Sequence, residues 1–294
     1  MNVIQIQKLT RDYGNGKGIF DVSFEVKQGE VFGFLGPNGA GKTTTIRHLM
    51  GFLRPESGSC MVGGLDCWSK RPEIQKNLGY IPGEINLFDD MSGMDFLKFT
   101  SKYRGMKDEG RKRELLERFE LDAHGKFKKM SKGMKQKLGI VAAFMHDPEV
   151  LILDEPTSGL DPLMQNRFIE MVLEEKAKCK TILMSSHMFD EVERTCHRIG
   201  IIRNGKLAAV DSVDELKAKQ TKKYIITFEN SKAAADFENE PMETKALTHH
   251  RVEVTVQNNI GKLIAAMAKY PVINLSAPQQ NLEEIFLQYY GGAR

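Results

Sequence analysis

The segment GPNGAGKT at residues 36–43 limits the folds open to this chain more than any other. It matches the pattern G-x-x-x-x-G-K-[ST], follows the strand-like residues 31–35, VFGFL, and precedes the helix-like run TTTIRHLM. In that context the pattern predicts a loop whose backbone N–H groups face phosphates at the N-terminus of a helix. We expect Lys42 to reach the β and γ phosphates of a nucleotide, and the Thr43 hydroxyl to bind Mg²⁺.

The apolar pattern predicts an α/β fold. Strands are expected at residues 3–9, 20–26, 31–35, 150–153 and 181–184. The first three are joined by glycine-containing turns and predict an antiparallel opening. The later two alternate with helices, as in a mostly parallel sheet that helices cover. Residues 86–149 look helical throughout, and the Asn204–Gly205 pair between two apolar runs predicts a hairpin.

The pattern changes after the polar stretch KAKQTKK, which ends at residue 223. From there it predicts strand, helix, strand, helix, short strand and helix, in that order, at residues 224–228, 231–237, 251–256, 260–270, 272–277 and 282–290. We therefore expect a large first domain at residues 1–220 and a separate small α+β domain at residues 221–294.

Charge, cysteine content and the apolar pattern indicate which partners and which compartment to expect for this chain. Lys and Arg number 42 against 39 Asp and Glu, and the net charge of +3 is too small to indicate nucleic acid. Cys60, Cys67, Cys179 and Cys196 show neither metal-ligand spacing nor a dense disulfide pattern, which fits the reducing cytoplasm. The N-terminus lacks the apolar centre of a signal peptide, and no uninterrupted apolar run approaches the length of a bilayer.

Two adjacent carboxylates follow the buried-type strand in VLILDEP. They should emerge at the carboxyl edge of a parallel sheet, where Asp154 can hold Mg²⁺ and Glu155 can orient or deprotonate an attacking water. His187 follows a second such strand and can approach the same edge, although a lone histidine there is more often structural. Tyr13 lies in a turn, where it can stack on an adenine base or simply pack.

The stretch SKGMKQK at residues 131–137 begins a predicted helix with an excess of basic side chains. The lysines of this region are Lys126, Lys128, Lys129, Lys132, Lys135 and Lys137. Cations are normally unfavourable at the positive end of the helix dipole. The cluster therefore predicts either an anion that comes to meet it or a patch of solvated lysines.

Four motifs together, GPNGAGKTT, MSKGM, LILDEPTSGLDP and SSH, resemble those of the nucleotide-binding subunit of an ABC transporter. The resemblance covers residues 1 to about 220. It implies a P-loop NTPase core with an antiparallel β subdomain and a helical subdomain at about residues 86–149. The variant SKGMKQKL, the stretch LDEPTSGLDP and the appended domain are most similar to bacterial ABC-2-type exporter ATPases, which serve drug, antibiotic, lantibiotic-peptide and sodium efflux.

The resemblance implies ATP and Mg²⁺ as cofactors and assigns a role to each matching residue. Tyr13 stacks on adenine, Glu155 is the catalytic base, His187 is the switch histidine, and Thr43 and Asp154 hold the metal. The remaining contacts of the phosphate loop are Gly36, Asn38, Gly39, Ala40, Gly41, Lys42 and Thr44.

A second set of residues acts across a dimer in this family. Ser131 and Gly133 belong to the signature loop, which meets the γ-phosphate of ATP held by the opposite subunit, and Asp161 links the two sites. The anion that the lysine cluster predicts would then be the γ-phosphate of the ATP bound to the partner subunit.

The partners implied are a second cassette, identical or related, and a separately encoded ABC-2-type membrane permease, with no nucleic acid. The chain would hydrolyse ATP in a head-to-tail dimer at the cytoplasmic face of the cell membrane, held there by the permease. Leu87, Phe88 and Phe96 are candidates for the wall of the docking groove, or for core residues of the helical insert. Two alternatives are a soluble ABC protein acting on ribosomes or DNA, and a regulatory ATP-binding module with little turnover.

The sequence departs from the family pattern in two places. Gly83 of YIPGE stands where the family usually has a glutamine that touches Mg²⁺ and the attacking water, and Glu84 follows it. We expect Glu84 to take part in Mg²⁺ binding or in coupling to the partner, although a carboxylate would repel the γ-phosphate. Met134 replaces the glutamine that usually ends the signature.

Overall fold

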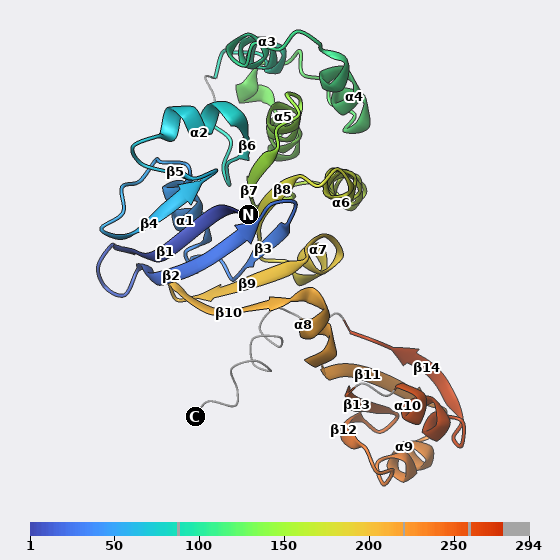
Figure 1. Ribbon diagram of the computed structural model, residues 1–294. Helices are drawn as coiled ribbons and strands as arrows, with labels where there is room; N and C mark the ends of the chain where they lie inside the picture. The colour runs from blue at the N-terminus through green and yellow to red at the C-terminus, as the bar shows by residue number, and fades with distance from the viewer. Residues whose placement is uncertain (87–88, 220, 258–259, 279–294) are drawn as a thin grey trace. The chain divides into compact units, whose positions relative to one another are not determined.

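A computed structural model describes all of the chain except residues 87–88, 220, 258–259 and 279–294 (Figure 1). The chain divides into two compact units, Met1–Val213 and Asp214–Arg294. Each unit is described by itself. The docking candidates Leu87 and Phe88, and the helix expected at residues 282–290, lie outside the described residues.

A six-stranded sheet forms the centre of the first unit. Its strands, in spatial order, are β10 (Lys206–Ser212), β9 (Arg198–Arg203), β3 (Val31–Leu35), β8 (Thr181–Ser186), β7 (Val150–Asp154) and β6 (Leu78–Ile81). All neighbours run parallel except β9 and β10, which form the hairpin predicted at Asn204–Gly205. Every residue of β3 and β8 is buried, as expected for parallel strands that are covered on both faces.

A second, antiparallel sheet packs against the first. Its order is β2 (Gly18–Lys27), β1 (Asn2–Asp12), β4 (Ser57–Val62) and β5 (Leu65–Asp66). The antiparallel pairing predicted for the first strands is confirmed for β1 and β2. The prediction that β3 joins them is wrong, since β3 lies in the parallel sheet. Its residues VFGFL are all apolar or glycine and lack the alternation of a strand with one face in water. The Phe24 ring of β2 stacks on Phe32 of β3 at 5.0 Å between centroids and joins the two sheets.

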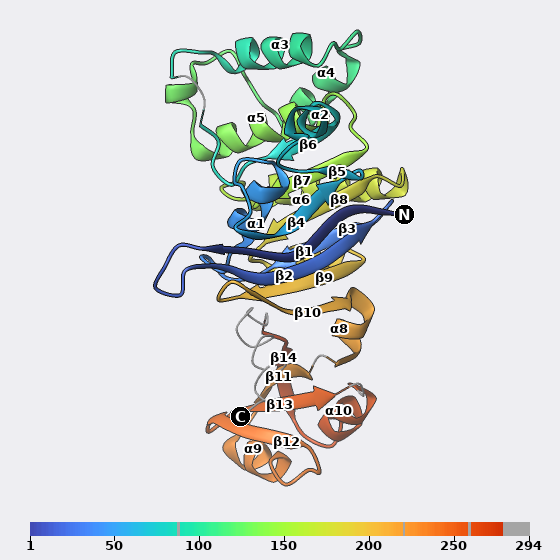
Figure 2. The same cartoon turned by 60° about the vertical axis from the view of Figure 1, so that its left-hand side comes forward.

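The remaining helices of the first unit fall into two groups. The core carries α1 (Lys42–Leu49), α2 (Arg71–Asn77), α6 (Pro162–Ala177) and α7 (Phe189–Thr195). The region expected to be helical carries α3 (Gly93–Tyr103), α4 (Gly110–Arg118), a 3₁₀ turn (Phe127–Lys129) and α5 (Lys132–Phe144), with α3 and α4 at one end of the unit in Figures 1 and 2. Helix throughout residues 86–149 is wrong, since Gly105 adopts a left-handed φ of 64° and Asp108 accepts a hydrogen bond from the Gly110 N–H.

The second unit contains a four-stranded antiparallel sheet with a split β-α-β arrangement. Its elements are α8 (Val213–Lys219), which begins at the boundary, β11 (Thr221–Phe228), α9 (Ser231–Phe237), β12 (Glu243–Thr248), β13 (Arg251–Gln257), α10 (Ile260–Met267) and β14 (Val272–Ser276). The strand order is β12-β13-β11-β14. The sequence did not predict β12, an edge strand whose residues ETKALT are mostly exposed and show no apolar alternation.

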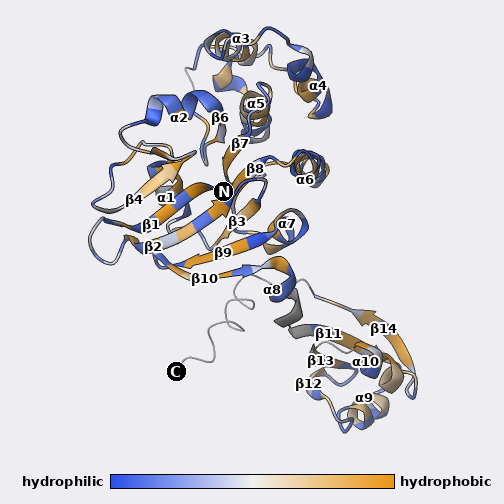
Figure 3. Ribbon diagram, viewed as in Figure 1, coloured by the Kyte–Doolittle hydropathy of each residue, from blue (hydrophilic) through white to orange (hydrophobic). Residues whose placement is uncertain are grey.

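Each unit closes its own hydrophobic core. Phe228, Phe237, Val252 and Leu263 are buried together in the second unit, apart from the large cluster of the first. Figure 3 shows hydrophobic residues concentrated on the strands of the central sheet. Among the described residues, no helix combines the length and the apolar character needed to cross a bilayer.

A buried carboxylate ties three elements of the first unit together. Glu175 of α6 is fully buried and pairs with Arg111 of α4, with Lys178 at 3.0 Å and with Lys180 at 3.0 Å. Burial raises the pKa of this carboxyl. The hydrogen bonds from the two lysines and the charge of Arg111 lower it by more than burial raises it, so the net pKa lies below the usual value. The cluster therefore favours the ionised form.

We expect Glu175→Ala to lower the free energy of unfolding by about 3 kcal/mol, because it removes the buried carboxylate that pairs with Arg111 and with the buried ammonium of Lys180. Glu174→Ala is the matched control: its half-exposed carboxylate pairs with Arg118, and its loss should cost less than about 1 kcal/mol. The deficit of Glu175→Ala should be full at neutral pH and shrink as pH falls through the lowered folded-state pKa. Urea unfolding at pH 7 and at steps from about pH 5 to about pH 3 measures both, and equal losses for the two variants at pH 7 would contradict this account.

Candidate functional site

The phosphate-binding loop spans residues 36–41, between the end of β3 and the start of α1. A Cβ built on Gly36 would lie 2.4 Å from the Ile202 carbonyl oxygen. Gly41 has φ 110°, and a Cβ there would lie 2.6 Å from a methyl group of Ile19. Only glycine fits at these positions without displacing its neighbours, so the sequence of the loop follows from its tight path.

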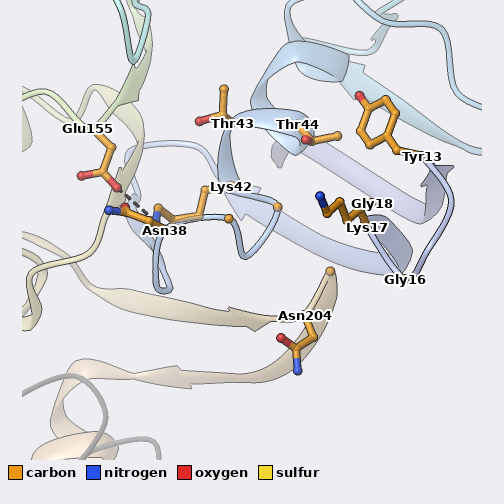
Figure 4. Close-up of a pocket in the computed structure, with 13 residues that line it drawn as sticks. Tyr13, Gly16, Lys17, Gly18, Asn38, Lys42, Thr43, Thr44, Glu155 and Asn204 are labelled. Atoms are coloured by element: carbon orange, nitrogen blue, oxygen red, sulfur yellow. Dashed lines mark ion pairs between the residues drawn. The ribbon is translucent and has the colours of Figure 1, made fainter.

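Lys42 lies at the centre of the loop with its side chain 5% exposed. Its ammonium donates to the carbonyl oxygens of Gly36 at 2.5 Å and Pro37 at 3.1 Å. It also forms an ion pair of 3.1 Å with Glu155 Oε1, drawn as a dashed line in Figure 4. The cation expected to reach phosphate is thus held beside the expected base.

Asp154 ends β7 and is completely buried. Its Oδ1 accepts a 2.6 Å hydrogen bond from the Ser185 hydroxyl, whereas its Oδ2 has no hydrogen-bond partner among the described residues. Burial raises the pKa of this carboxyl, although Ser185 and the nearby Thr43 hydroxyl act to lower it. A Cβ built on Gly83 would lie 3.0 Å from Asp154 Oδ2 and 3.8 Å from Thr43 Oγ1, so these two oxygens open onto the same space.

This corner fits Mg²⁺. The ion takes oxygen ligands, often one or two from protein with the rest from phosphates and water. Thr43 and Asp154 supply two oxygens of the right chemistry, and a cation there would offset the burial of an unpaired carboxylate oxygen. The described residues contain no group of three or more His, Cys, Asp or Glu side chains that could hold a metal unaided.

Glu155 follows Asp154 in a left-handed backbone conformation, with φ 49°, that side-chain-bearing residues rarely adopt. Its N–H donates to the Ser185 hydroxyl at 3.0 Å. Its Oε2 lies 2.6 Å from Nδ1 of His187, which is half exposed just beyond β8. The carboxylate is therefore held between the Lys42 ammonium and the His187 ring.

A cavity of about 470 Å³ runs along the loop (Figure 4). It is lined by Tyr13, Gly16, Lys17, Gly18, Asn38, Gly39, Gly41, Lys42, Thr43, Thr44, Glu155, Asn204 and Gly205. Tyr13 is half exposed, with the Arg11 guanidinium 5.4 Å from its ring centroid. Most residues expected at the site are thus brought together, and Lys17 and Asn204 join them without having been predicted.

The tip of the β9–β10 hairpin fixes one wall of this cavity. The Gly205 N–H donates to the Ala40 carbonyl at 3.0 Å, and the Phe20 N–H donates to the Gly205 carbonyl at 2.7 Å. The Asn-Gly signal predicted the turn correctly, but nothing in the sequence indicated that the turn would reach the phosphate loop.

A second cavity of about 400 Å³ adjoins the metal corner. Its polar lining includes Asn38, Thr43, Arg47, Glu84, Asn86, Glu155, Ser158 and His187. The exposed Glu84 does lie near the position of the missing glutamine. Arg47 and Asn86 also line that cavity, so Glu84 is not the only polar side chain near the missing glutamine.

Ser131, Gly133 and Asp161 do not line either cavity. Ser131 caps α5 by accepting a 3.2 Å hydrogen bond from the Met134 N–H, and Asp161 caps α6 by accepting one of 3.0 Å from the Met164 N–H. A Cβ on Gly133 would lie 2.8 Å from the Gly159 carbonyl oxygen, so the start of α5 packs on the loop after β7. The signature residues lie apart from the phosphate loop of their own chain.

Part of the lysine cluster finds partners within the chain. Lys126 and Lys128 pair with Asp90 at 3.3 and 2.8 Å, and the Lys135 ammonium lies 4.2 Å from the centroid of the Phe127 ring. Solvated or locally paired lysines therefore account for at least three of the six.

Comparison with known proteins shows the family to which this chain belongs. The family described as ABC transporter matches residues 19–158. The linearmycin resistance ATP-binding protein LnrL of Bacillus subtilis (strain 168) is 32% identical, over 98% of this chain and 98% of its own. The chain belongs to the ABC transporter family. The bacitracin transport ATP-binding protein BcrA of Bacillus licheniformis is 33% identical, over 99% of this chain and 98% of its own.

Solved structures of ABC cassettes share the fold. A structure of the ATP-binding subunit of an ABC transporter matches with a TM-score of 0.66 at 32% identity, over 73% of this chain and 92% of its own. The dimeric cassette MJ0796 matches with a TM-score of 0.64 at 20% identity, over 71% and 98%, which bears on the fold alone. The predicted P-loop ATPase fold is confirmed, and as an ABC cassette the chain is an ATP-binding subunit and an ATPase.

We expect Gly83→Ala to raise the Mg²⁺ concentration needed for half-maximal ATP hydrolysis by about tenfold, because the new methyl group would press on Asp154 Oδ2. Gly125→Ala is the control, since a Cβ there meets nothing within 4 Å. A Mg²⁺ titration of ATPase activity compares the two. Wild-type Mg²⁺ dependence in Gly83→Ala would show that Asp154 and Gly83 do not flank the metal.

Proposed function

We propose that this chain hydrolyses ATP in a head-to-tail dimer and thereby powers export through a separately encoded ABC-2-type membrane permease. One observation carries the proposal. Lys42, Asp154 and Glu155 converge within one chain, whereas Ser131 caps a helix that lines neither cavity. A second chain, identical or related, that brings its own Ser131 and Gly133 to the γ-phosphate would complete the site.

The chain's own residues define the chemical step. Glu155 accepts a proton from the attacking water, and His187 holds the second oxygen of that carboxylate in place. Lys42 pairs with Glu155 in this structure, so a γ-phosphate competes for the same ammonium and frees the carboxylate to act as a base. Bound Mg²⁺, held by Thr43 and Asp154, would supply positive charge to the phosphate oxygens.

The other site residues take binding roles in this proposal. Tyr13 stacks on adenine at the open end of the cavity, while Gly36, Asn38, Gly39, Ala40, Gly41 and Thr44 form the cradle around the phosphates. Asp161, which caps α6, fixes the loop that faces the partner subunit.

The relatives LnrL and BcrA support an export role, because their names record linearmycin resistance and bacitracin transport. We infer that the permease partner carries a drug or antibiotic and holds this chain at the cytoplasmic face of the membrane. Exposed aromatic side chains on α3 offer a contact surface: Phe99 and Tyr103 stack at 6.3 Å, while Phe96 is half buried.

One of the two alternatives, a regulatory ATP-binding module with little turnover, is favoured by Gly83 at the glutamine position. Steady-state ATPase of the chain alone and with permease-containing membranes separates the two. Stimulation by the permease supports transport coupling, and negligible turnover in both conditions supports the regulatory module.

We expect Glu155→Gln to keep ATP binding but to lower turnover by about 10²- to 10⁴-fold, because the amide cannot accept the proton. An ATP-dependent dimer should then persist, and sedimentation with ATP and Mg²⁺ would detect it. Glu149→Gln, at an exposed position just before β7, is the control. Normal turnover, or a monomer under all conditions, would count against the base assignment and the dimer.

The second unit is proposed to assist assembly. It has its own core and exposes apolar side chains, among them Ile260 and Ile264 of α10 and Ile273 of β14. An isologous contact with a second copy would hold two cassettes near one another between closures and raise their effective concentration.

Truncation after residue 220 should keep nucleotide binding but raise the protein concentration that gives half-maximal ATPase, because the tether is lost. The measurement is specific activity against protein concentration for the full and shortened chains. Ile264→Asp in the full chain tests the same surface without removing the unit. Superimposable curves for all three proteins would reject the tethering role.

A further inference from the structure

Helix α5 carries a buried amide that the nucleotide site has not yet explained. Gln136 is 3% exposed. Its Nε2 donates to the Pro156 carbonyl oxygen at 2.8 Å and lies 3.4 Å from the Glu155 carbonyl oxygen. A buried amide needs hydrogen-bond partners, and these two carbonyls belong to the proposed base and the residue after it.

The segment that receives these bonds is strained. Glu155 adopts the left-handed φ of 49°, a conformation that persists only where neighbouring groups enforce it. On the amino side, its N–H is fixed by the Ser185 hydroxyl at 3.0 Å. On the carbonyl side, the Glu155 oxygen accepts a 3.0 Å hydrogen bond from the Ser158 N–H. The second side-chain restraint comes from Gln136, through the 3.4 Å contact with this oxygen and the 2.8 Å hydrogen bond to the Pro156 carbonyl. The two restraints differ in origin, since Ser185 belongs to the central sheet and Gln136 belongs to the helix that Ser131 caps.

The first turn of α5 also touches the same loop further along. Gly133 packs so closely on Gly159 that a Cβ would lie 2.8 Å from its carbonyl oxygen, and a Cβ on Gly159 would lie 2.9 Å from the Lys132 side chain. The start of α5 and the loop after β7 therefore contact one another at two levels, near Gly159 and near Glu155. A shift of α5 cannot leave the Glu155 backbone unaffected.

We propose that Gln136 is a positioning residue that holds Glu155 in its hydrolytic conformation and makes the base of one site depend on the placement of α5 in the same chain. This inference rests on the proposed dimer, in which the partner's nucleotide engages Ser131 at the start of α5. When the partner's nucleotide contacts Ser131, the effect passes along α5 to Gln136. The hydrogen bonds of Gln136 then carry it to Glu155, which is the base of this chain's own nucleotide site. The lining of the main cavity does not include Gln136, so we expect ATP binding to be retained when its amide is lost.

The first test is Gln136→Met, which keeps the side-chain length and removes the donor. We expect kcat to fall by about tenfold or more, with the KM for ATP within about twofold of wild type, because the base is displaced while the phosphate contacts remain. Gln75→Met is the matched control: its Nε2 donates to the Met50 carbonyl at 2.7 Å, outside the site. Unchanged kcat in Gln136→Met, or an equal loss in Gln75→Met, overturns the proposal.

The second test asks in which chain Gln136 acts. Dimers are purified from two differently tagged chains, one of which carries Glu155→Gln, and single-turnover phosphate release then reports the remaining base. Gln136→Met should slow release by about tenfold or more when it lies in the chain with the intact Glu155, and should leave the release rate unchanged when it lies in the Glu155→Gln chain. The reverse pattern would mean that Gln136 acts through Ser131 on the partner's ATP, and equal loss in both would mean a general folding defect.

Different results would reject the proposed function and the role of Gln136. A wild-type chain without ATP turnover or without an ATP-dependent dimer rejects the proposed function. A wild-type chain that hydrolyses ATP as a dimer, with Gln136→Met indistinguishable from it, rejects only the role of Gln136.

Discussion

The ion pair between Lys42 and Glu155 joins the two halves of the nucleotide site. The ammonium is 5% exposed and the carboxylate 17% exposed, so their attraction is weakly screened by solvent. Lys42 begins α1 and Glu155 follows β7, two segments more than a hundred residues apart in the sequence. They meet because β3 and β7 flank β8 in the parallel sheet and end at the same edge.

Ser185 organises that edge from its centre. Its hydroxyl donates to Asp154 Oδ1 and accepts from the Glu155 N–H, so one small side chain holds the proposed metal ligand and the backbone of the proposed base. It can do so because β8 lies beside β7 in register, with Ser185 opposite Asp154. The left-handed turn at Glu155 aims the carboxylate back toward Lys42, and the surrounding hydrogen bonds offset the backbone strain.

The sequence allowed prediction of features whose cause is local. The phosphate loop, the acidic pair after β7 and the Asn204–Gly205 hairpin each carry their signal within a few residues. Features that arise from tertiary packing had no such signal: Gln136 looks like any polar residue in a helix, and its burial follows only from where α5 meets the loop after β7. The same holds for Gly83, whose closeness to the Asp154 carboxylate follows only from the fold, because the two residues are far apart in the chain.

Main-chain hydrogen bonds alone join three segments: the Asn204–Gly205 turn, the phosphate loop and β2. The Gly205 amide and carbonyl bond to Ala40 of the phosphate loop and Phe20 of β2, and the loop that carries Tyr13 leads directly into β2. The span from Tyr13 to Lys42 is therefore set by the backbone, which side-chain substitutions leave in place. Substitutions in the side chains that line the cavity would therefore change which groups meet a nucleotide without changing the distance that the nucleotide must span.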